Sequence, residues 1–227
     1  MTDNKYTVSE RSDIIKECHD FGVIVDSREI FLTGDLSQPD HDEIDVASAN
    51  QFIRNLTLLN NCGNSAILVH LLSSGGCWNY GMAIYNAIKA SADDPKQSDI
   101  VILAYGCVAS MASIIPQAAN LRIIMPDATF MMHYGSFAVS DSHQVAESAM
   151  NWSKKHDIPR MLQIYIDKCK EGSKFEGWTD NKITKYLKEQ LAYKQDVYLT
   201  SKDSVEYGLM DGILGEEGFE NISKLRA

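Results

Sequence analysis

The residues best suited to chemistry lie where a short apolar run gives way to small side chains. Residues 101–105 have the length and composition of a buried strand, and Ala109-Ser110-Met111-Ala112 opens a run of helix formers. Ser110 would lie at the helix start, where free N–H groups and the helix dipole stabilise developing negative charge. This position suits a nucleophilic serine. A serine that merely caps the helix explains the same stretch, and on this segment alone capping is the commoner outcome.

Two further side chains could complete a catalytic set with Ser110. His133 ends the strand-like run 129–133, and an imidazole there could deprotonate the serine and later protonate a leaving amine. Asp196 follows a long helical segment and could orient that imidazole. Spacing alone singles out neither, because a lone histidine is more often structural and the chain has 31 acidic residues.

A glycine pair follows the neighbouring strand-like run. Ser73-Ser74-Gly75-Gly76 comes directly after residues 66–72, and loops leaving the carboxyl ends of adjacent parallel strands meet at one crevice. Paired glycines let a backbone N–H approach a substrate oxygen unobstructed. We therefore predict the N–H groups of Gly76 and Met111 as the two oxyanion donors. A plain tight turn is the open alternative, whereas a phosphate loop is disfavoured because no Gly-Lys-Ser/Thr follows.

The elements that must position these groups alternate between strand and helix. Helical apolar spacing covers 44–59 and 82–90, between strand-like runs, and this alternation from Ile30 to His133 predicts an α/β fold with right-handed crossovers. Gly106 is expected to end the central strand, and the helix after it to continue to about Asn120. The strand-like runs lie at 21–25, 29–34, 66–72, 99–105, 121–125 and 129–133.

The two ends of this core look different. Residues 1–20 are polar and are expected to be mobile. Residues 142–193 are polar with helical apolar spacing, which predicts two helices broken around 171–173. That segment is too large for a simple connection, so it is expected to form an arm or to contact a partner. A short helix at 202–207 and a last strand or loop follow it.

Composition excludes several classes of function. The net charge of -10 and the pI of about 5.0 argue against a nucleic-acid surface and against binding to anionic membranes. No stretch has the roughly 20 apolar residues of a membrane span, and the N-terminus lacks the apolar core of a signal peptide. Five cysteines without a CxxC pair indicate neither a disulfide framework nor a zinc site. A cytoplasmic protein without metal or cofactor is expected.

Together these segments resemble the proteolytic subunit of the ATP-dependent Clp protease, a family of serine peptidases. The order Ser, His, Asp is the order of that family, and the resemblance covers roughly 28–135 and 194–214. The matching stretches are Arg28-Glu29-Ile30-Phe31-Leu32-Thr33-Gly34, Ser73-Ser74-Gly75-Gly76, Gly81-Met82-Ala83-Ile84-Tyr85, Ala109-Ser110-Met111-Ala112, Met131-Met132-His133, Asp196-Val197-Tyr198-Leu199-Thr200 and Val205-Glu206-Tyr207-Gly208-Leu209-Met210-Asp211.

The resemblance implies a site as well as a fold. It implies a triad of Ser110, His133 and Asp196, with Gly76 and Met111 as oxyanion donors and no cofactor or metal. The implied fold is the ββα superhelix shared with the crotonases, with a long helical handle. The chain would divide into an N-terminal segment, mobile or axial, a head with nucleophile and histidine, a handle, and a C-terminal head segment with the aspartate, at 1–27, 28–135, 136–193 and 194–227.

The resemblance also implies an assembly. Family members cleave unfolded polypeptides or peptides inside two stacked heptameric rings of identical subunits. An AAA+ unfoldase partner supplies any ATP dependence, since this chain has no phosphate loop. Neither nucleic acid nor membrane is an expected partner.

The chain departs from the family pattern at several positions, as a divergent or phage-type member would. Ser74 replaces a usual proline, and Tyr134-Gly135-Ser136-Phe137 replaces the usual Gln-Pro and glycine-rich strand. Leu68 and His70 stand where the family often has docking tyrosines, and the 136–195 segment is longer than usual. Three alternatives stay open: a latent or structural ring subunit, a phage maturation protease, and a crotonase-type acyl-CoA enzyme in which the triad has no role.

Overall fold

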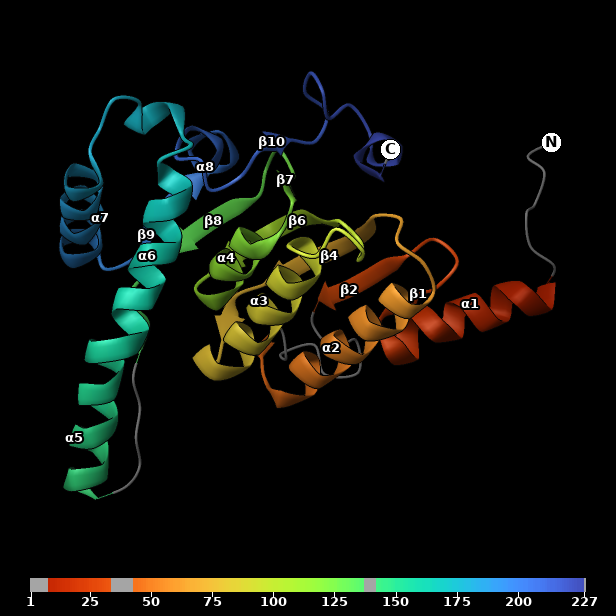
Figure 1. Ribbon diagram of the computed structural model, residues 1–227, viewed down its shortest axis with the longest axis horizontal. Coiled ribbons are helices and arrows are strands. Elements are labelled where there is room, and N and C mark those ends of the chain that lie inside the picture. The colour runs from red at the N-terminus through yellow and green to blue at the C-terminus, as the bar shows by residue number, and fades with distance from the viewer. Residues whose placement is uncertain (1–7, 34–42, 137–141, 227) are drawn as a thin grey trace.

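The computed structural model describes residues 8–33, 43–136 and 142–226. The chain forms a mixed α/β fold around one mainly parallel sheet (Figure 1). Among the described strands, only β1 against β2, and β8 against β9, run antiparallel. The main path of hydrogen-bonded strands is β1 (Val23–Ile24), β2 (Glu29–Thr33), β4 (Ile67–Ser73), β6 (Ile100–Ala109), β7 (Leu121–Ile124) and β10 (Gly212–Ile213).

The central strand β6 is longer than the sequence predicts. Gly106 does not end it; it takes φ +39°, and the register of β6 with β4 shifts between Leu71 and Ser73. The strand continues past this irregularity, so its first half pairs with β7 and its second half pairs with β8 (Thr129–Met132). β8 in turn pairs with β9 (Val197–Thr200). One strand therefore carries Ser110 to the neighbourhood of β8 and β9.

Alternation along the central strands gives the sheet two buried faces. Ile67, Val69 and Leu71 belong to a large core that also contains apolar residues of α2 (Val46–Asn61) and α3 (Trp78–Ala92). On the opposite face, Leu68 packs in a smaller cluster with residues of the C-terminal segment, which ends in η4 (Ile222–Arg226). Burial on both faces explains the nearly continuous apolar composition of these strands.

The helix after Ser110 is much shorter than predicted. α4 covers only Met111–Ile114, and a 3-10 turn, η1 (Ile115–Ala118), replaces its continuation toward Asn120. Pro116 lies in this turn; it has no N–H to donate to an α-helical ladder. The chain then enters β7 directly.

The segment after β8 contains two long helical parts, and the break between them includes the predicted residues 171–173. α5 (His143–Trp152) runs through a π-helical turn, η2 (Ser153–Asp157), into α6 (Ile158–Cys169). The chain then passes through η3 (Ser173–Phe175) into a separate helix, α7 (Asp180–Lys194). No described residue of α5 is buried, and α5 extends away from the sheet (Figure 1). α6, by contrast, packs its apolar face into the main core.

The remaining elements lie at the two ends of the core and in the loops. Residues 8–20, expected to be mobile, belong to helix α1 (Val8–Phe21), which the sequence analysis did not predict. α8 (Ser201–Glu206) follows β9 as expected. A small parallel pair joins β3 (Glu43–Ile44) to β5 (Gly75–Gly76). No helix among the described residues is long and apolar enough to span a membrane.

A buried arginine fastens the C-terminal segment to the sheet. Arg122 on β7 is only 3% exposed, and its Nε donates to Asp211 Oδ2 at 3.0 Å. Its Nη1 donates to Gln117 Oε1 at 2.9 Å and to the carbonyl of Gly208 at 3.0 Å. These contacts hold the chain between α8 and β10 against the end of η1.

Candidate active site

Ser110 occupies a strained turn between β6 and α4. Its φ of +54° lies in the left-handed region that disfavours side chains, and holding a residue there costs about 1–3 kcal/mol. The N–H of Ser110 donates to the carbonyl of Met131 on β8 at 3.0 Å, which helps to hold the turn. The Ser110 side chain does not cap α4. Its Oγ instead lies 2.7 Å from Nε2 of His133.

Pairing of β8 with β9 brings His133 to Asp196. Met132 is the antiparallel partner of Val197, so the residues immediately beyond this pair, His133 and Asp196, are adjacent. His133 Nδ1 lies 3.2 Å from Asp196 Oδ1. The three predicted side chains therefore form one continuous chain of polar contacts. The Asp196 side chain is 47% exposed, so it is the most open member of the set.

The glycine pair packs directly against the Ser110 turn. Gly75 has φ +112°, and a Cβ added there would lie 2.5 Å from Ser110 Cβ and 3.0 Å from the backbone nitrogen of Met111. Only glycine permits this approach. Met111 is the first residue of α4, where the N–H has no acceptor within the helix. The loop of the predicted donor Gly76 thus lies beside the predicted donor Met111.

β3 holds the glycine loop from its other side, which the sequence analysis did not predict. Ile44 pairs with Gly76 in parallel, and the N–H of Cys77 donates to the Ile44 carbonyl at 2.8 Å. A Cβ on Gly76 would come within 2.5 Å of the Ile44 backbone. Glu43 is the first residue of β3, and residues 34–42 before it lie outside the described residues.

A buried hydrogen-bond chain behind the nucleophile also went unrecognised in the sequence. Ser113 Oγ donates to the Ser110 carbonyl at 2.6 Å and lies 2.7 Å from the hydroxyl of Tyr165 on α6. Tyr165 is 1% exposed, and burial raises its pKa, so the group stays a neutral donor. A serine three residues after the nucleophile, in an otherwise apolar run, was the available signal.

The candidate site opens into a pocket of about 600 Å³, which is within the usual range for small-molecule sites. Ser110, His133 and both glycines line it, together with apolar side chains from α4, β8 and α6. Its charged lining residues are Glu43, Asp157 and, when protonated, His133. Burial raises the pKa of the lining Tyr134. The apolar lining side chains include Trp78, Ile114, Met131, Ile158 and Met161.

No group of three or more His, Cys, Asp or Glu side chains in the described ranges could hold a metal ion. The five cysteines are all free thiols. The pocket wall contains the hydroxyl of Ser110 and the imidazole of His133, and the Asp196 carboxylate contacts that imidazole.

Comparison with known proteins places this chain in a family. A family model described as Clp protease matches residues 16–217, which include every candidate site residue. The chain belongs to the Clp protease family. Three curated relatives of the family are similar at low identity, and each is described as a proteolytic subunit of the ATP-dependent Clp protease.

The relatives cover different shares of the chain. That of Ligilactobacillus salivarius is 26% identical over 215 residues, covering 92% of this chain and 94% of the relative. That of Dehalococcoides mccartyi is 29% identical over 151 residues, 65% of this chain and 66% of the relative. Subunit 1 of Streptomyces coelicolor is 26% identical over 181 residues, 79% of this chain and 72% of the relative. These identities fit a divergent member of the Clp protease family.

Proposed function

We propose that the chain is a serine endopeptidase of the Clp type, with Ser110 as nucleophile. The observation that carries the proposal is the contact chain from Ser110 Oγ to His133 Nε2 at 2.7 Å, and from His133 Nδ1 to Asp196 Oδ1 at 3.2 Å. Both distances fit the hydrogen bonds that this reaction needs in a resting enzyme. Family membership and the order of the three residues support the same assignment.

The reaction follows from this arrangement. Ser110 Oγ attacks the carbonyl carbon of a peptide bond while His133 Nε2 takes its proton, and Asp196 stabilises the resulting imidazolium. The peptide C–N bond breaks as His133 returns the proton to the leaving amine. A water molecule, deprotonated by His133, then hydrolyses the ester on Ser110 and releases the acid.

Backbone N–H groups would stabilise the oxyanion of both tetrahedral intermediates. We assign these donors to Gly76 and Met111, because the glycine loop lies against the Ser110 turn and Met111 begins α4. The loss of one such donor costs about 3–4 kcal/mol of transition-state stabilisation in other hydrolases. The strained φ of Ser110 is the cost of presenting its Oγ between these donors and His133.

We also infer the assembly and the substrate. The proposed enzyme forms stacked heptameric rings of identical subunits with the ββα superhelix head, and residues 136–193 form the handle. The exposed side chains of Val145, Met150 and Trp152 on α5 support burial of this helix against another subunit. Unfolded polypeptides delivered by an AAA+ unfoldase, or short peptides, are the proposed substrates.

One observation favours a second candidate, a catalytically latent ring subunit. The Asp196 carboxylate is about half exposed, and its 3.2 Å contact with His133 is the longer of the two. Water competing for that carboxylate would leave the imidazole poorly oriented until a partner covers it. This candidate keeps the same residues but requires activation.

Labelling with a fluorophosphonate separates these candidates. We expect one adduct per subunit on Ser110, located by peptide mass spectrometry, in a particle that elutes as a large ring. Ser110→Ala removes the adduct, whereas Ser223→Ala, at an exposed serine in the C-terminal segment, retains it. Wild-type labelling of Ser110→Ala would refute the nucleophile assignment. A folded ring without an adduct would identify the latent subunit.

A further inference from the structure

The candidate active-site pocket has an acidic side chain on the α6 side that the proposed reaction does not use. Asp157 is the last residue of η2 and lies half-buried at the start of α6, in the wall of the pocket that contains Ser110. Its carboxylate does not cap α6, and it forms no ion pair or hydrogen bond with a described residue. No buried side-chain polar atom in the described part of the chain lacks a partner. The Asp157 carboxylate is therefore open to solvent, where a substrate can reach it.

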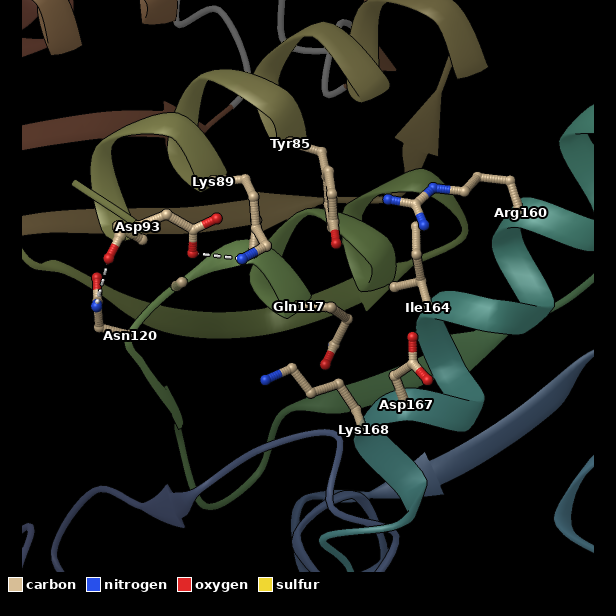
Figure 2. A pocket seen from close by; sticks show the side chains of 12 residues that line it. Tyr85, Lys89, Asp93, Gln117, Asn120, Arg160, Ile164, Asp167 and Lys168 are labelled. Atoms are coloured by element: carbon tan, nitrogen blue, oxygen red, sulfur yellow. Dashed lines mark hydrogen bonds and ion pairs between the residues drawn. The ribbon is translucent and has the colours of Figure 1, made fainter. Parts of the chain in front are cut away.

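No described lysine or arginine pairs with this carboxylate. The pocket wall, as far as the structure describes it, contains neither residue type. Lys154 and Lys155 precede Asp157 in η2, but both are exposed and neither lines the pocket. Arg160, three residues further on, points toward Tyr85 on α3, with its guanidinium 5.8 Å from the ring centre (Figure 2). It lines a second pocket, which shares no lining residue with the first, so the active-site pocket keeps its negative charge.

Packing of α6 sets the position of Asp157 relative to the nucleophile. The Tyr165 hydroxyl lies 2.7 Å from Ser113 Oγ, which in turn donates to the Ser110 carbonyl. Met161 lies four residues before Tyr165, and Asp157 four residues before Met161, so the three lie on nearly the same face of the helix. Each step of four residues covers about 6 Å along the axis. Asp157 is therefore about one turn beyond Met161, and both line the pocket.

The pocket wall beside Asp157 is apolar. Ile114, Met131 and Met161 line it, none of them more than 9% exposed, and Ile158 lies next to the carboxylate in the chain. Lysine and arginine pack their methylene stems against apolar surface and keep the charged end paired or in water. A four-carbon stem spans about the one turn between Met161 and Asp157. A long cationic side chain therefore matches this wall along its whole length.

We propose that Asp157 is a specificity-determining residue that selects lysine or arginine directly beside the scissile bond. The inference rests on the proposed peptidase function and names the substrate class of the same site. The stem packs on Ile158 and Met161, and the cation pairs with the Asp157 carboxylate. The other lining carboxylate, Glu43 on β3, is exposed, so solvent and salt screen its attraction more strongly than that of the half-buried Asp157.

Two peptides that differ in one side chain test this selection. One has a single lysine in an uncharged background, and the other has norleucine there, which keeps the four-carbon stem without the charge. We expect the kcat/KM of the wild type to be about 10-fold higher for the lysine peptide, since a hydrogen bond to a charged group contributes about this factor. Mass spectrometry of the products should locate the cut next to the lysine.

Variants of the carboxylate assign the selection to one residue. Asp157→Asn should lower the ratio of the two kcat/KM values to about 1, because the amide has no charge to pair with lysine. Asp157→Glu restores the charge and should restore the preference. Asp127→Asn makes the same change at an exposed position between β7 and β8, outside the pocket, and should keep the wild-type ratio. A preference that survives in Asp157→Asn but disappears in Glu43→Gln would overturn the role of Asp157.

Binding to the Ser110→Ala variant separates this inference from the proposed function. Fluorescence anisotropy of the labelled peptides gives their Kd values without turnover, and the lysine peptide should bind about 10-fold more tightly. This difference should disappear when Asp157→Asn is added. Equal Kd values for the two peptides would overturn the inference, whether or not the wild type cleaves them. Cleavage that persists in Ser110→Ala would instead overturn the proposed nucleophile and leave the measured binding preference standing.

Discussion

Replacement of Gly75 by alanine tests whether the glycine loop is held against the nucleophile. The added Cβ would lie 2.5 Å from Ser110 Cβ and 2.8 Å from the carbonyl oxygen of Ala109. The neighbours are short and fixed, since one is backbone and the other is the Cβ of a strained residue. The new methyl group has no flexible chain end to push aside. The loop, or the Ser110 turn, must move.

The size of the effect follows from two contributions. Alanine at φ +112° adds backbone strain of about 1–3 kcal/mol to the folded state. Ordinary contact begins at 3.4 Å, so the 2.5 Å approach requires Ser110 and residue 75 to separate by about 0.9 Å. A displacement of about 1 Å at a reacting group costs about 100-fold in rate. We therefore expect Gly75→Ala to slow acylation of Ser110 about 100-fold while the protein remains folded.

Gly215→Ala separates crowding from strain. Gly215 has φ +98°, and an added Cβ would meet nothing within 4 Å. This variant should lose a similar 1–3 kcal/mol of unfolding free energy through strain alone. Its rate constant for acylation by a fluorophosphonate should equal that of the wild type, with stability measured by urea unfolding. Wild-type acylation by folded Gly75→Ala would refute the packing argument, and equal slowing of both variants would attribute the effect to general loss of stability.

Three further experiments test the framework around the site. Ser113→Ala leaves the buried Tyr165 hydroxyl without its partner and should lower the free energy of unfolding by about 1–3 kcal/mol. The double variant with Tyr165→Phe should be more stable than Ser113→Ala alone, because no buried hydroxyl is then left unpaired. Urea unfolding of the single and double variants measures both effects. Asp211→Asn strips the buried Arg122 of its main counter-charge and should lower the unfolding free energy by about 3 kcal/mol, and a loss below 0.5 kcal/mol would contradict that role. Burial raises the pKa of Cys169 to about 12, so its thiol should resist iodoacetamide below that pH while the exposed cysteines react. Mass spectrometry of the labelled native protein checks this. Equal labelling of Cys169 and the exposed cysteines would contradict the buried position of Cys169.

Local pattern was sufficient for most of the core. The apolar runs around Ile67 and Ile102 are buried on both faces of the sheet, and such runs are readable one segment at a time. The same reasoning failed at Gly106 and after Ser110. A glycine inside an apolar run predicts the end of a strand. Here β6 continues past Gly106 because β4 and β8 form hydrogen bonds with it beyond the irregularity. The helix formers after Ser110 predicted a helix to about Asn120, but the structure has a 3-10 turn at Pro116 instead.

The candidate site was partly readable in the same way. Ser110 and the glycine pair each follow a strand, so the rule for parallel sheets places them at one edge. His133 and Asp196 carried no comparable signal, because each is one polar residue beside a strand, and only the order of the set and the family resemblance singled them out. The support from Ile44 could not be seen in the sequence, since its side chain is an ordinary apolar one, and Ser113 was the one sign of the contact with Tyr165.

The sequence by itself determined the alternation of strands and helices from β4 to β8, the serine at a strand–helix junction, and the glycines that permit close approach. These features depend on periodicity and on backbone freedom, which are properties of a few neighbouring residues. Only the tertiary structure decided that His133 meets Asp196, 63 residues away, and that Tyr165 reaches Ser113 across 52. Those meetings depend on the register of β8 with β9 and on how α6 packs against the core. Register and packing are set by the summed burial of many side chains, so no short stretch of sequence encodes them.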